Sequence, residues 1–329
     1  MKLSRRTFLH LAAGAAALPA FSRNAWAQAY PTRPIRMIVP TPPGGIIDAV
    51  GRVLADRMKD SLRQPVIVEN IAGADGSIAA GRAARATPDG YTIELGLLST
   101  HVLNGALYSL SYDVLNDFAP IAPIAWTPFI LFAKKSLAAV DLHELINLLK
   151  SNSGKAVSAG AYVTAIHLIT NFFQHETATE FAVVPYRGPA AAMQDLISGQ
   201  IDLLFYPPDG LPVLRAGNVK AYAVTSSTRL VLAPDVPTFR ELNFPKLAFS
   251  AWFGLFGPRG TSADVISKLN GAAVEALGNP ALQTRFIELG QEVYPLAQQT
   301  PAALDELVRT DAAKWWPIVK ALNFKGNAP

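Results

Sequence analysis

Residues 35–48 read IRMIVPTPPGGIID, and this stretch decides the fold. Its first five residues are a short, mostly apolar run that predicts a buried strand. Three prolines and two glycines then end the strand. Apolar residues at positions 47, 50, 54, 58 and 62 recur at helical spacing, so we expect a helix to begin at about Gly45.

The start of this helix is a candidate seat for a carboxylate. The first N–H groups of a helix have no partner within it, and the helix dipole favours negative charge there. Gly44 and Gly45 lack side chains that would keep a ligand from the backbone. No P-loop lysine follows the glycines and no G-x-G-x-x-G opens the helix, which argues against phosphate. Two alternatives stay open: the glycines only form a tight turn, and Asp48 only complements the helix dipole.

A second unit repeats this design. Residues 66–70 predict a strand, residues 71–77 (IAGADGS) a glycine loop, and residues 78–86 an alanine-rich helix. The loops of consecutive parallel βα units meet at one edge of the sheet, where open α/β sheets bind ligands. Asp75 is unusual in an anion-binding loop, so it either points outward or contacts a hydroxyl or amine of the ligand. Ser99, after the third strand, is a candidate ligand hydroxyl or a helix N-cap.

The first 27 residues have the pattern of an export signal. Arg5 and Arg6 precede an apolar segment, residues 11–20, and small residues end the pattern at Ala27. This arrangement predicts a secretory signal peptide cleaved near Ala27, and the paired arginines favour the twin-arginine (Tat) route over Sec. The apolar segment is shorter than the roughly 20 residues of a membrane span. We therefore expect an exported protein.

Composition excludes several function classes. The chain has 329 residues, with 29 lysines and arginines against 25 acidic residues. Four of the basic residues and none of the acidic ones lie in residues 1–27, which leaves 25 of each sign in the mature chain. This neutral chain gives no support for nucleic-acid binding. Without cysteine there is no disulfide, thiolate nucleophile or cysteine metal site, and we expect no cofactor and no metal.

About 300 mature residues suggest two domains. After the amphipathic helix expected at residues 141–150, a new series of strands and helices runs to about residue 225. We expect two doubly wound α/β domains joined by a hinge of two chain crossings. Domain 1 comprises residues 28–127 and 231–329, and domain 2 comprises residues 128–230.

Several short motifs follow one another in a characteristic order over nearly the whole mature chain. They are Val39-Pro40 with the Pro-Pro-Gly-Gly turn and Asp48, Val68-Glu69-Asn70 with Gly73-Ala74, Thr87-Pro-Asp-Gly-Tyr-Thr92, Asp117-Phe-Ala-Pro120, His167-Leu168, Pro185-Tyr-Arg-Gly188 and Pro234-Asp-Val-Pro-Thr238. With these motifs the chain resembles the periplasmic substrate-binding proteins of tripartite tricarboxylate transporters, often called Bug proteins.

The resemblance implies a type II periplasmic-binding-protein (Venus flytrap) fold that closes on a small organic acid. It also implies a periplasmic protein that delivers this acid to the permease subunits of a tripartite tricarboxylate transporter. We expect a monomer, with a dicarboxylate or an aromatic carboxylate as candidate ligands. In this family, main-chain groups of loops from both domains usually hold the carboxylate, often with bridging waters. Carried to this chain, the resemblance nominates Pro43, Gly44, Gly45, Gly73, Ala74, Tyr186 and Gly188.

The loop before His167 departs from the family pattern. Relatives usually have Gly-x-Gly-Ser there, whereas this chain has Ala161-Tyr-Val-Thr164. Thr164 still offers a hydroxyl to a ligand, and Tyr206 stands where many relatives have aspartate. With Tyr162 and Tyr206 near the site, the pocket suits a ligand with an apolar or aromatic body, unless both rings only pack.

An enzyme and a sensor are the alternatives to a transport receptor. Residues 143–147 and 175–179 each begin like the zinc motif H-E-x-x-H but lack its second histidine, and no G-x-S-x-G nucleophile motif occurs. His167 on an apolar helix is either a structural histidine, a ligand contact or a general base. We therefore expect a binding protein and no catalytic residues. A sensor that presents its carboxylate-bound form to a membrane receptor is not distinguished from a transporter component by the sequence.

Overall fold

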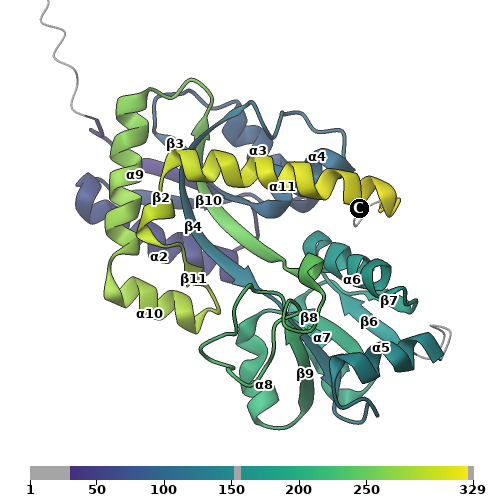
Figure 1. The fold of residues 1–329 in the computed structure, drawn as a ribbon. Helices are drawn as coiled ribbons and strands as arrows, with labels where there is room; N and C mark the ends of the chain where they lie inside the picture. Colours follow the sequence, from purple (N-terminus) through teal and green to yellow (C-terminus); the bar gives the residue numbers. More distant parts are fainter. Residues whose placement is uncertain (1–29, 152–156, 325–329) are drawn as a thin grey trace, which may run out of the picture.

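The computed structural model describes residues 30–151 and 157–324, which form two α/β lobes, one above the other in Figure 1. The predicted export signal lies outside the described residues. None of the helices in the described part is long and apolar enough to cross a membrane.

The first lobe contains residues from both ends of the described chain. Its strands are β1 (Ile35–Val39), β2 (Val66–Asn70), β3 (Thr92–Leu97), β4 (Phe118–Pro128), β10 (Ser250–Pro258) and β11 (Glu292–Val293). Its helices are α2 (Ile46–Leu62), α3 (Ser77–Ala84), α4 (Asn104–Leu107), α9 (Ala263–Leu277), α10 (Pro280–Glu288) and α11 (Pro301–Ala321). The predicted start of α2 at about Gly45 is confirmed, because Gly45 is its N-cap residue.

The second lobe is continuous in sequence except for residues 152–156. Its strands are β5 (Ile130–Lys134), β6 (Ser158–Ala161), β7 (Ala182–Pro185), β8 (Leu203–Tyr206) and β9 (Val219–Val224). Its helices are α5 (Leu142–Ser151), α6 (Thr164–Thr177), α7 (Pro189–Ser198) and α8 (Leu211–Arg215).

Parallel strand pairs bring the predicted binding loops to one edge of each sheet. The strand orders are β11-β4-β10-β3-β1-β2 and β7-β6-β8-β5-β9. In the first sheet, β1 is parallel to both β2 and β3, so the loops that follow these three strands lie together. In the second sheet, β6 is parallel to β7 and β8, with the same consequence. The strands near the hinge, β4, β5 and β10, pair in antiparallel fashion, so both sheets are mixed.

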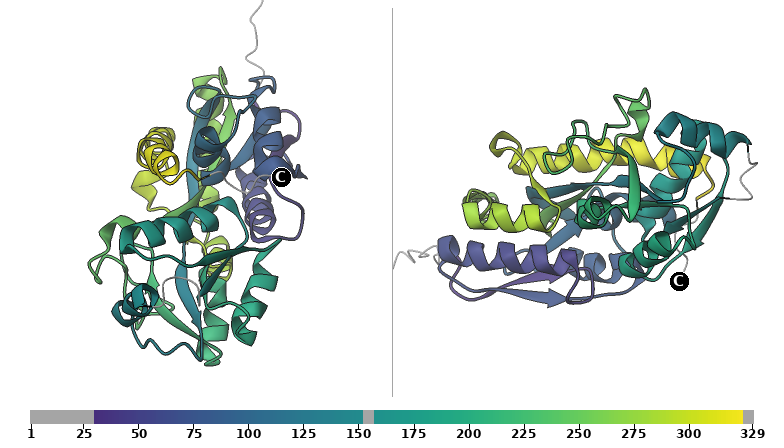
Figure 2. Two further views of the ribbon diagram at one scale, coloured as in Figure 1. Left: turned by 90° about the vertical axis from the view of Figure 1, so that its right-hand side faces the viewer. Right: turned by 90° about the horizontal axis from the view of Figure 1, so that it is seen from below.

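Helices cover both faces of each sheet (Figures 1 and 2). Apolar residues of α2, α9 and α10 form one core with β1, β3, β4 and β10. On the opposite face of the first sheet, α3 packs on β1, and the long α11 packs across β4. In the second lobe, α5 and α6 share a core with one face of the sheet, whereas α7 and α8 pack on the other.

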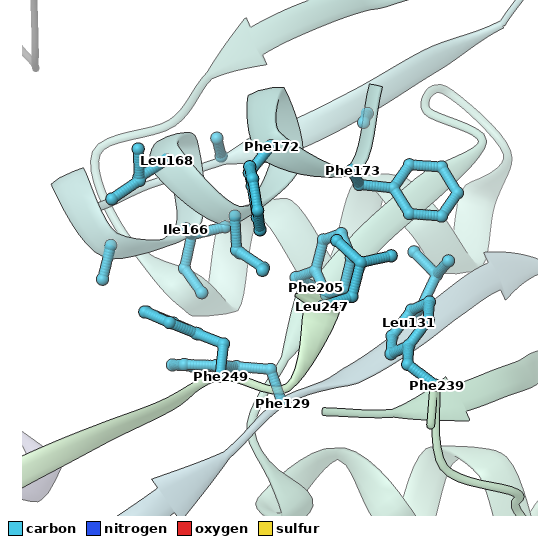
Figure 3. Packing of buried hydrophobic residues seen from close by; sticks show 14 of the residues in the cluster. Phe129, Leu131, Ile166, Leu168, Phe172, Phe173, Phe205, Phe239, Leu247 and Phe249 are labelled. Carbon is cyan, nitrogen blue, oxygen red and sulfur yellow. The ribbon is translucent and has the colours of Figure 1, made fainter. Parts of the chain in front are cut away.

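One apolar core runs through both lobes. It combines α6 and the second sheet with residues of β10 and α11 from the first lobe. Figure 3 shows its phenylalanines, among them Phe172 of α6 and Phe249 near β10. The ring of Trp315 in α11 lies 5.5 Å from that of Phe172 and 5.0 Å from that of Phe249, measured between centroids. The C-terminal helix thus joins the lobes beside the return crossing at Phe249 and, through Phe172, on α6.

The two crossings meet at Thr225. The chain passes from β4 to β5 through Phe129 and returns to the first lobe between Phe249 and Ser250. Thr225 Oγ1 accepts the N–H of Phe129 at 2.8 Å, the Thr225 N–H donates to Phe129 O at 2.8 Å, and Thr225 O accepts the N–H of Phe249 at 3.0 Å. These bonds tie the two crossings into one hydrogen-bonded hinge.

The return crossing lies later in the chain than the domain boundary expected at residue 231. The loop segment 226–249 packs against the second lobe, where Leu230, Ala233 and Val236 join its core. The N–H of Phe239 donates to Val224 O at 3.0 Å, which extends the edge of the second sheet at β9. This segment has no regular strand or long helix. Its sequence therefore shows no strand or helix periodicity from which the lobe that it packs against could be predicted.

Candidate functional site

The loop after β1 presents free amides at the start of α2. Gly44 has φ +91°, a conformation that favours glycine, and its N–H donates to Asp48 Oδ2 at 2.9 Å. Gly45 caps α2 without a side-chain hydrogen bond. The N–H groups of Gly45, Ile46 and Ile47 have no partner among the described residues. A Cβ at Gly44 or Gly45 would meet nothing within 4 Å, so this helix start faces open space.

Asp48 holds this loop in shape. Its side chain is buried, with 4% of the residue exposed, and it accepts hydrogen bonds from Arg52 Nε at 3.0 Å and Asn70 Nδ2 at 2.9 Å. The hydrogen bond from Arg52 is the largest of the causes that lower the pKa of Asp48 to about 2. Asn70 also donates to Thr41 O at 3.1 Å. The structure therefore places Asp48 beneath the glycine loop, with its oxygens already used by protein donors.

Asn70 is a supporting residue that the sequence reasoning did not single out as a contact. It ends β2 directly before the second glycine loop, so its side chain reaches back to the first loop. Its position, a polar residue at the carboxyl end of a strand beside another strand end, was the available signal. Asn70 thus joins the two loops that the sequence placed side by side.

The second loop is held in an unusual backbone conformation. Four successive residues, Gly73 to Gly76, have positive φ, including Ala74 at +46° and Asp75 at +51°. Asn104 Nδ2 supports the loop by donating to Asp75 O at 3.0 Å and to Ser77 Oγ at 2.9 Å. Non-glycine residues with left-handed dihedrals are uncommon, and such strain concentrates at functional sites. The loop geometry therefore sets the direction of the Cα–Cβ bond of Asp75.

Two tyrosines and a helix start lie at the carboxyl ends of β6 and β8 in the second lobe. Tyr162 and Tyr206 lie with their ring centroids 6.0 Å apart. Burial raises the pKa of both hydroxyls, that of Tyr206 to about 12, so both stay protonated at neutral pH. Asp209 lies near both rings and raises the pKa of both tyrosines further. Burial raises the pKa of Asp209 itself to about 6. Thr164 begins α6 and is fully buried.

The loop after β7 supplies a second uncapped helix start. Gly188 caps α7 without a side-chain hydrogen bond, and a Cβ there would meet nothing within 4 Å. Tyr186 is turned to its own lobe, because its hydroxyl donates to Asp195 Oδ2 at 2.7 Å and its N–H donates to Ala161 O at 2.7 Å. Gly188 thus repeats the design at Gly45, whereas the Tyr186 hydroxyl is already engaged.

The second glycine loop meets the start of α6 at the junction between the lobes. The hydroxyl of Thr164 lowers the pKa of Asp75 and of Tyr108, and Asp75 raises that of Tyr108, so these three side chains are neighbours. Burial nevertheless has the largest effect on the pKa of Asp75 and raises it above its usual value. Within the described residues, no partner in good hydrogen-bonding geometry exists for Asp75 Oδ2, Asn104 Oδ1 or Thr164 Oγ1, although all three atoms are buried. Unpaired buried polar atoms are costly, so these three atoms are candidates for ligand contact.

Comparison with known proteins assigns the family. Residues 50–324 match the model of the tripartite tricarboxylate transporter family receptor. The chain belongs to this family. The receptor is 35% identical to protein BugT of Bordetella pertussis over 303 residues, which cover 91% of this chain and 92% of that protein.

Solved structures of similar proteins share the fold. A structure of a periplasmic transporter has 37% sequence identity and a TM-score of 0.79 over 90% of this chain and 99% of that one. The MatC protein of Rhodopseudomonas palustris, solved with bound malate, has 34% identity and a TM-score of 0.77, with 88% and 100% of the chains covered. A protein of R. palustris solved with adipate has 29% identity and a TM-score of 0.78, with 89% and 98% covered. These likenesses confirm the expected two-lobe periplasmic-binding-protein fold.

The remaining predicted site residues are Ser99, His167 and Pro43, which lie in three different segments of the chain. Ser99 is half-buried and begins a short π-helix, Ser99–Leu103, which is followed in the chain by Asn104. His167 lies one turn into α6, with its ring 6.5 Å from that of Phe324 and its Nε2 buried without a partner in the described part of the chain. Burial lowers the pKa of His167, so it is neutral near pH 7. Pro43 is exposed in the first loop beside Gly44.

Two grooves of the receptor lie outside the glycine loops. One, of about 370 Å³, runs between the lobes and is lined by residues 208–215 and 284–290 with Leu232. Asp209, which raises the pKa of both tyrosines, is part of its lining. The other, of about 780 Å³, lies at the end of α11 beside Trp316 and Phe324. Neither groove is lined by the free amides or the unpaired atoms described above. No group of three histidine, aspartate or glutamate side chains in the described ranges could hold a metal ion.

Proposed function

We propose that this receptor captures a small organic carboxylate between its lobes and delivers it to the permease subunits of a tripartite tricarboxylate transporter. The observation that carries the proposal is the free helix start at Gly45, where Asp48 shapes the loop and three amides stay available. Oriented amides at a helix N-terminus bind carboxylates without a charged side chain. Bound malate and adipate in two related structures support a carboxylate as the ligand.

The residues that we assign to the ligand come from both lobes. From the first lobe they are Pro43, Gly44, Gly45, Gly73, Ala74, Asp75 and Ser99, and from the second lobe they are Tyr162, Thr164, His167, Gly188 and Tyr206. We assign Asp48 and Tyr186 to support of the loops and not to ligand contact, because their side-chain oxygens form hydrogen bonds within their own lobes. A ligand that contacts both sets favours the closed arrangement of the lobes by its differential affinity for that state.

The setting of this function is the periplasm. A periplasmic transporter and a periplasmic binding protein are among the structural neighbours, and the N-terminal pattern of residues 1–27 supports export by the Tat route with cleavage near Ala27. Delivery to a permease predicts that a strain without the receptor loses uptake of the acid. Retained uptake combined with loss of a transcriptional or signalling response to the acid would favour the sensor alternative.

A thermal-shift screen tests ligand class. We expect a mono- or dicarboxylate at 100 times its dissociation constant to add about 2.7 kcal/mol of stability, with sugars and amines as inactive controls. Stabilisation by sugars alone would refute the carboxylate assignment. Turnover of the bound acid by the purified protein would support an enzyme instead.

Paired glycine variants test the location of the site. Gly45→Val places a branched side chain over the free amides while its φ of −87° suits any residue, so binding should be lost and folding kept. Gly271→Val is the control, because Gly271 is exposed on α9 and its added Cβ would also meet open space. Equal affinity of the two variants would place the ligand elsewhere.

A further inference from the structure

The carboxyl group of Asp75 lies in the site that the proposed function assigns to an acid. Within the described residues, the causes that shift its pKa are burial and the Thr164 hydroxyl, and no lysine or arginine is among them. A buried carboxylate without a cation beside it disfavours a second negative charge in its neighbourhood. The site therefore holds an acid group of its own, whose ionised form a hydrogen-bond donor of the ligand would stabilise and a second carboxylate would oppose.

The position of this carboxyl is fixed by the loop. The backbone of Asp75 has φ +51°, and its carbonyl oxygen is held by Asn104 Nδ2 at 3.0 Å. Glycine would suit this conformation better than aspartate, so the backbone alone does not explain the residue. The side chain reaches across the junction to Thr164, the first residue of α6, whose N-cap Val163 contributes no side-chain hydrogen bond. Asp75 thus occupies the side of the site next to a helix start of the second lobe.

The unpaired atoms around Asp75 have a common chemical character. Asp75 Oδ2 and Asn104 Oδ1 are hydrogen-bond acceptors, and both are buried without a partner in good hydrogen-bonding geometry in the part of the chain that the structure describes. The hydroxyl of Thr164 lies near enough to Asp75 to lower its pKa. Asn104 cannot turn its amide to serve as a donor here without losing its bond to Asp75 O, because a carbonyl oxygen only accepts, whereas the Ser77 hydroxyl can donate or accept. A ligand group that donates would satisfy both acceptors, whereas a second ligand carboxylate would bring further acceptors and a like charge.

We propose that Asp75 makes this receptor select monocarboxylates whose far end carries a hydrogen-bond donor, an ammonium or a hydroxyl, over dicarboxylates of the same length. The inference rests on the proposed function, because the ligand's single carboxylate occupies the free amides at Gly45. Its far end then lies against Asp75 and Asn104, with Thr164 as an additional hydroxyl partner. Asp75 is a specificity-determining residue in this arrangement.

Two series of matched acids test the inference by titration calorimetry. The first series is succinate, 4-hydroxybutyrate, 4-aminobutyrate and butyrate, and the second is adipate, 6-hydroxyhexanoate, 6-aminohexanoate and hexanoate. In at least one series, we expect the wild-type receptor to bind a donor-bearing acid at least about ten-fold more tightly than the dicarboxylate and the unsubstituted acid, a difference of about 1.4 kcal/mol.

Variants of Asp75 connect this preference to one side chain. Asp75→Asn keeps the size of the side chain, and Asp75→Gly suits the left-handed backbone, so at least one should fold, as thermal unfolding will show. Both should reduce the discrimination against the dicarboxylate by about ten-fold or more. Asp56→Asn, an equal change of charge on the exposed surface of α2, should leave it unchanged.

Each result separates the inference from the proposed function. Tightest binding of the dicarboxylates by the wild type, or the same ratio in the folded Asp75 variants, would overturn the inference while leaving a carboxylate receptor. If no acid of either series binds to the wild type, the inference is overturned, and the thermal-shift screen decides the proposed carboxylate function separately.

Discussion

Glu94 is a buried glutamate whose replacement by glutamine should stabilise the receptor at alkaline pH. It lies in β3, is fully buried, and neither carboxyl oxygen has a hydrogen-bond partner in the described ranges. The nearest charged candidate is His101 Nε2, 3.8 Å away, but burial lowers the pKa of His101 to about 3. A neutral histidine offers no charge to Glu94, so burial dominates and raises the pKa of the carboxyl to about 8.

The size and sign of the effect follow from this shift. The pKa of Glu94 is raised in the folded state from the usual 4.5, so the stability linked to its bound proton is complete below pH 4.5 and is lost as pH rises to 8. With 1.36 kcal/mol per pKa unit, the wild type should lose about 3 kcal/mol from this group between pH 5 and pH 8. Glu94→Gln has no proton to lose there, so its stability relative to the wild type should rise by about the same amount.

Urea unfolding followed by circular dichroism at pH 5, 6, 7 and 8 measures the difference between the two proteins. Glu69→Gln is the control for loss of a negative charge, because Glu69 forms surface ion pairs with Arg36 and Arg82 at 3.1 and 3.0 Å. A difference between Glu94→Gln and wild type that stays constant over this pH range would refute the assignment of a protonated, buried glutamate.

Two further predictions concern the hinge and the first binding loop. Thr225→Val leaves the buried N–H of Phe129 without its acceptor and should cost roughly 1–3 kcal/mol, with faster amide exchange at Phe129, whereas Thr225→Ser should keep this amide protected. Equal exchange in both variants would contradict the role of the hydroxyl. Asp48→Asn removes a carboxylate whose pKa is lowered to about 2, so it should lower the stability by about 1–2 kcal/mol near pH 7, a loss that shrinks as pH falls from about 4 to 2. The free energy of unfolding of both proteins, measured from pH 7 down to pH 2, tests this loss. A difference between Asp48→Asn and wild type at pH 3 as large as that at pH 7 would contradict it. The expected loss of about 1–2 kcal/mol is reduced for solvent screening because the Arg52 side chain is half-exposed.

Local patterns in the sequence were enough for the architecture and for the placement of the first two loops. The apolar run ending at Val39, the glycines and the spacing of apolar residues after Gly45 encode β1, a turn and α2, because strand and helix periods are properties of neighbouring residues. A repeat of the design at residues 66–86 predicted that two loops would share one sheet edge, and the parallel pairing of β1 with β2 confirms this. The family motifs then indicated the fold of the second lobe.

Contacts between distant segments decided the rest. The sequence does not show that Asp48 is held by Asn70, that Trp315 of the last helix packs on Phe172, or that Thr225 joins both crossings, because these pairs lie far apart in the chain. Nor does spacing reveal which polar atoms remain unpaired after folding, since that depends on every neighbour. The sequence therefore determined the elements and the loops, whereas the packing of the two lobes determined that Asp75 meets Thr164 at their junction.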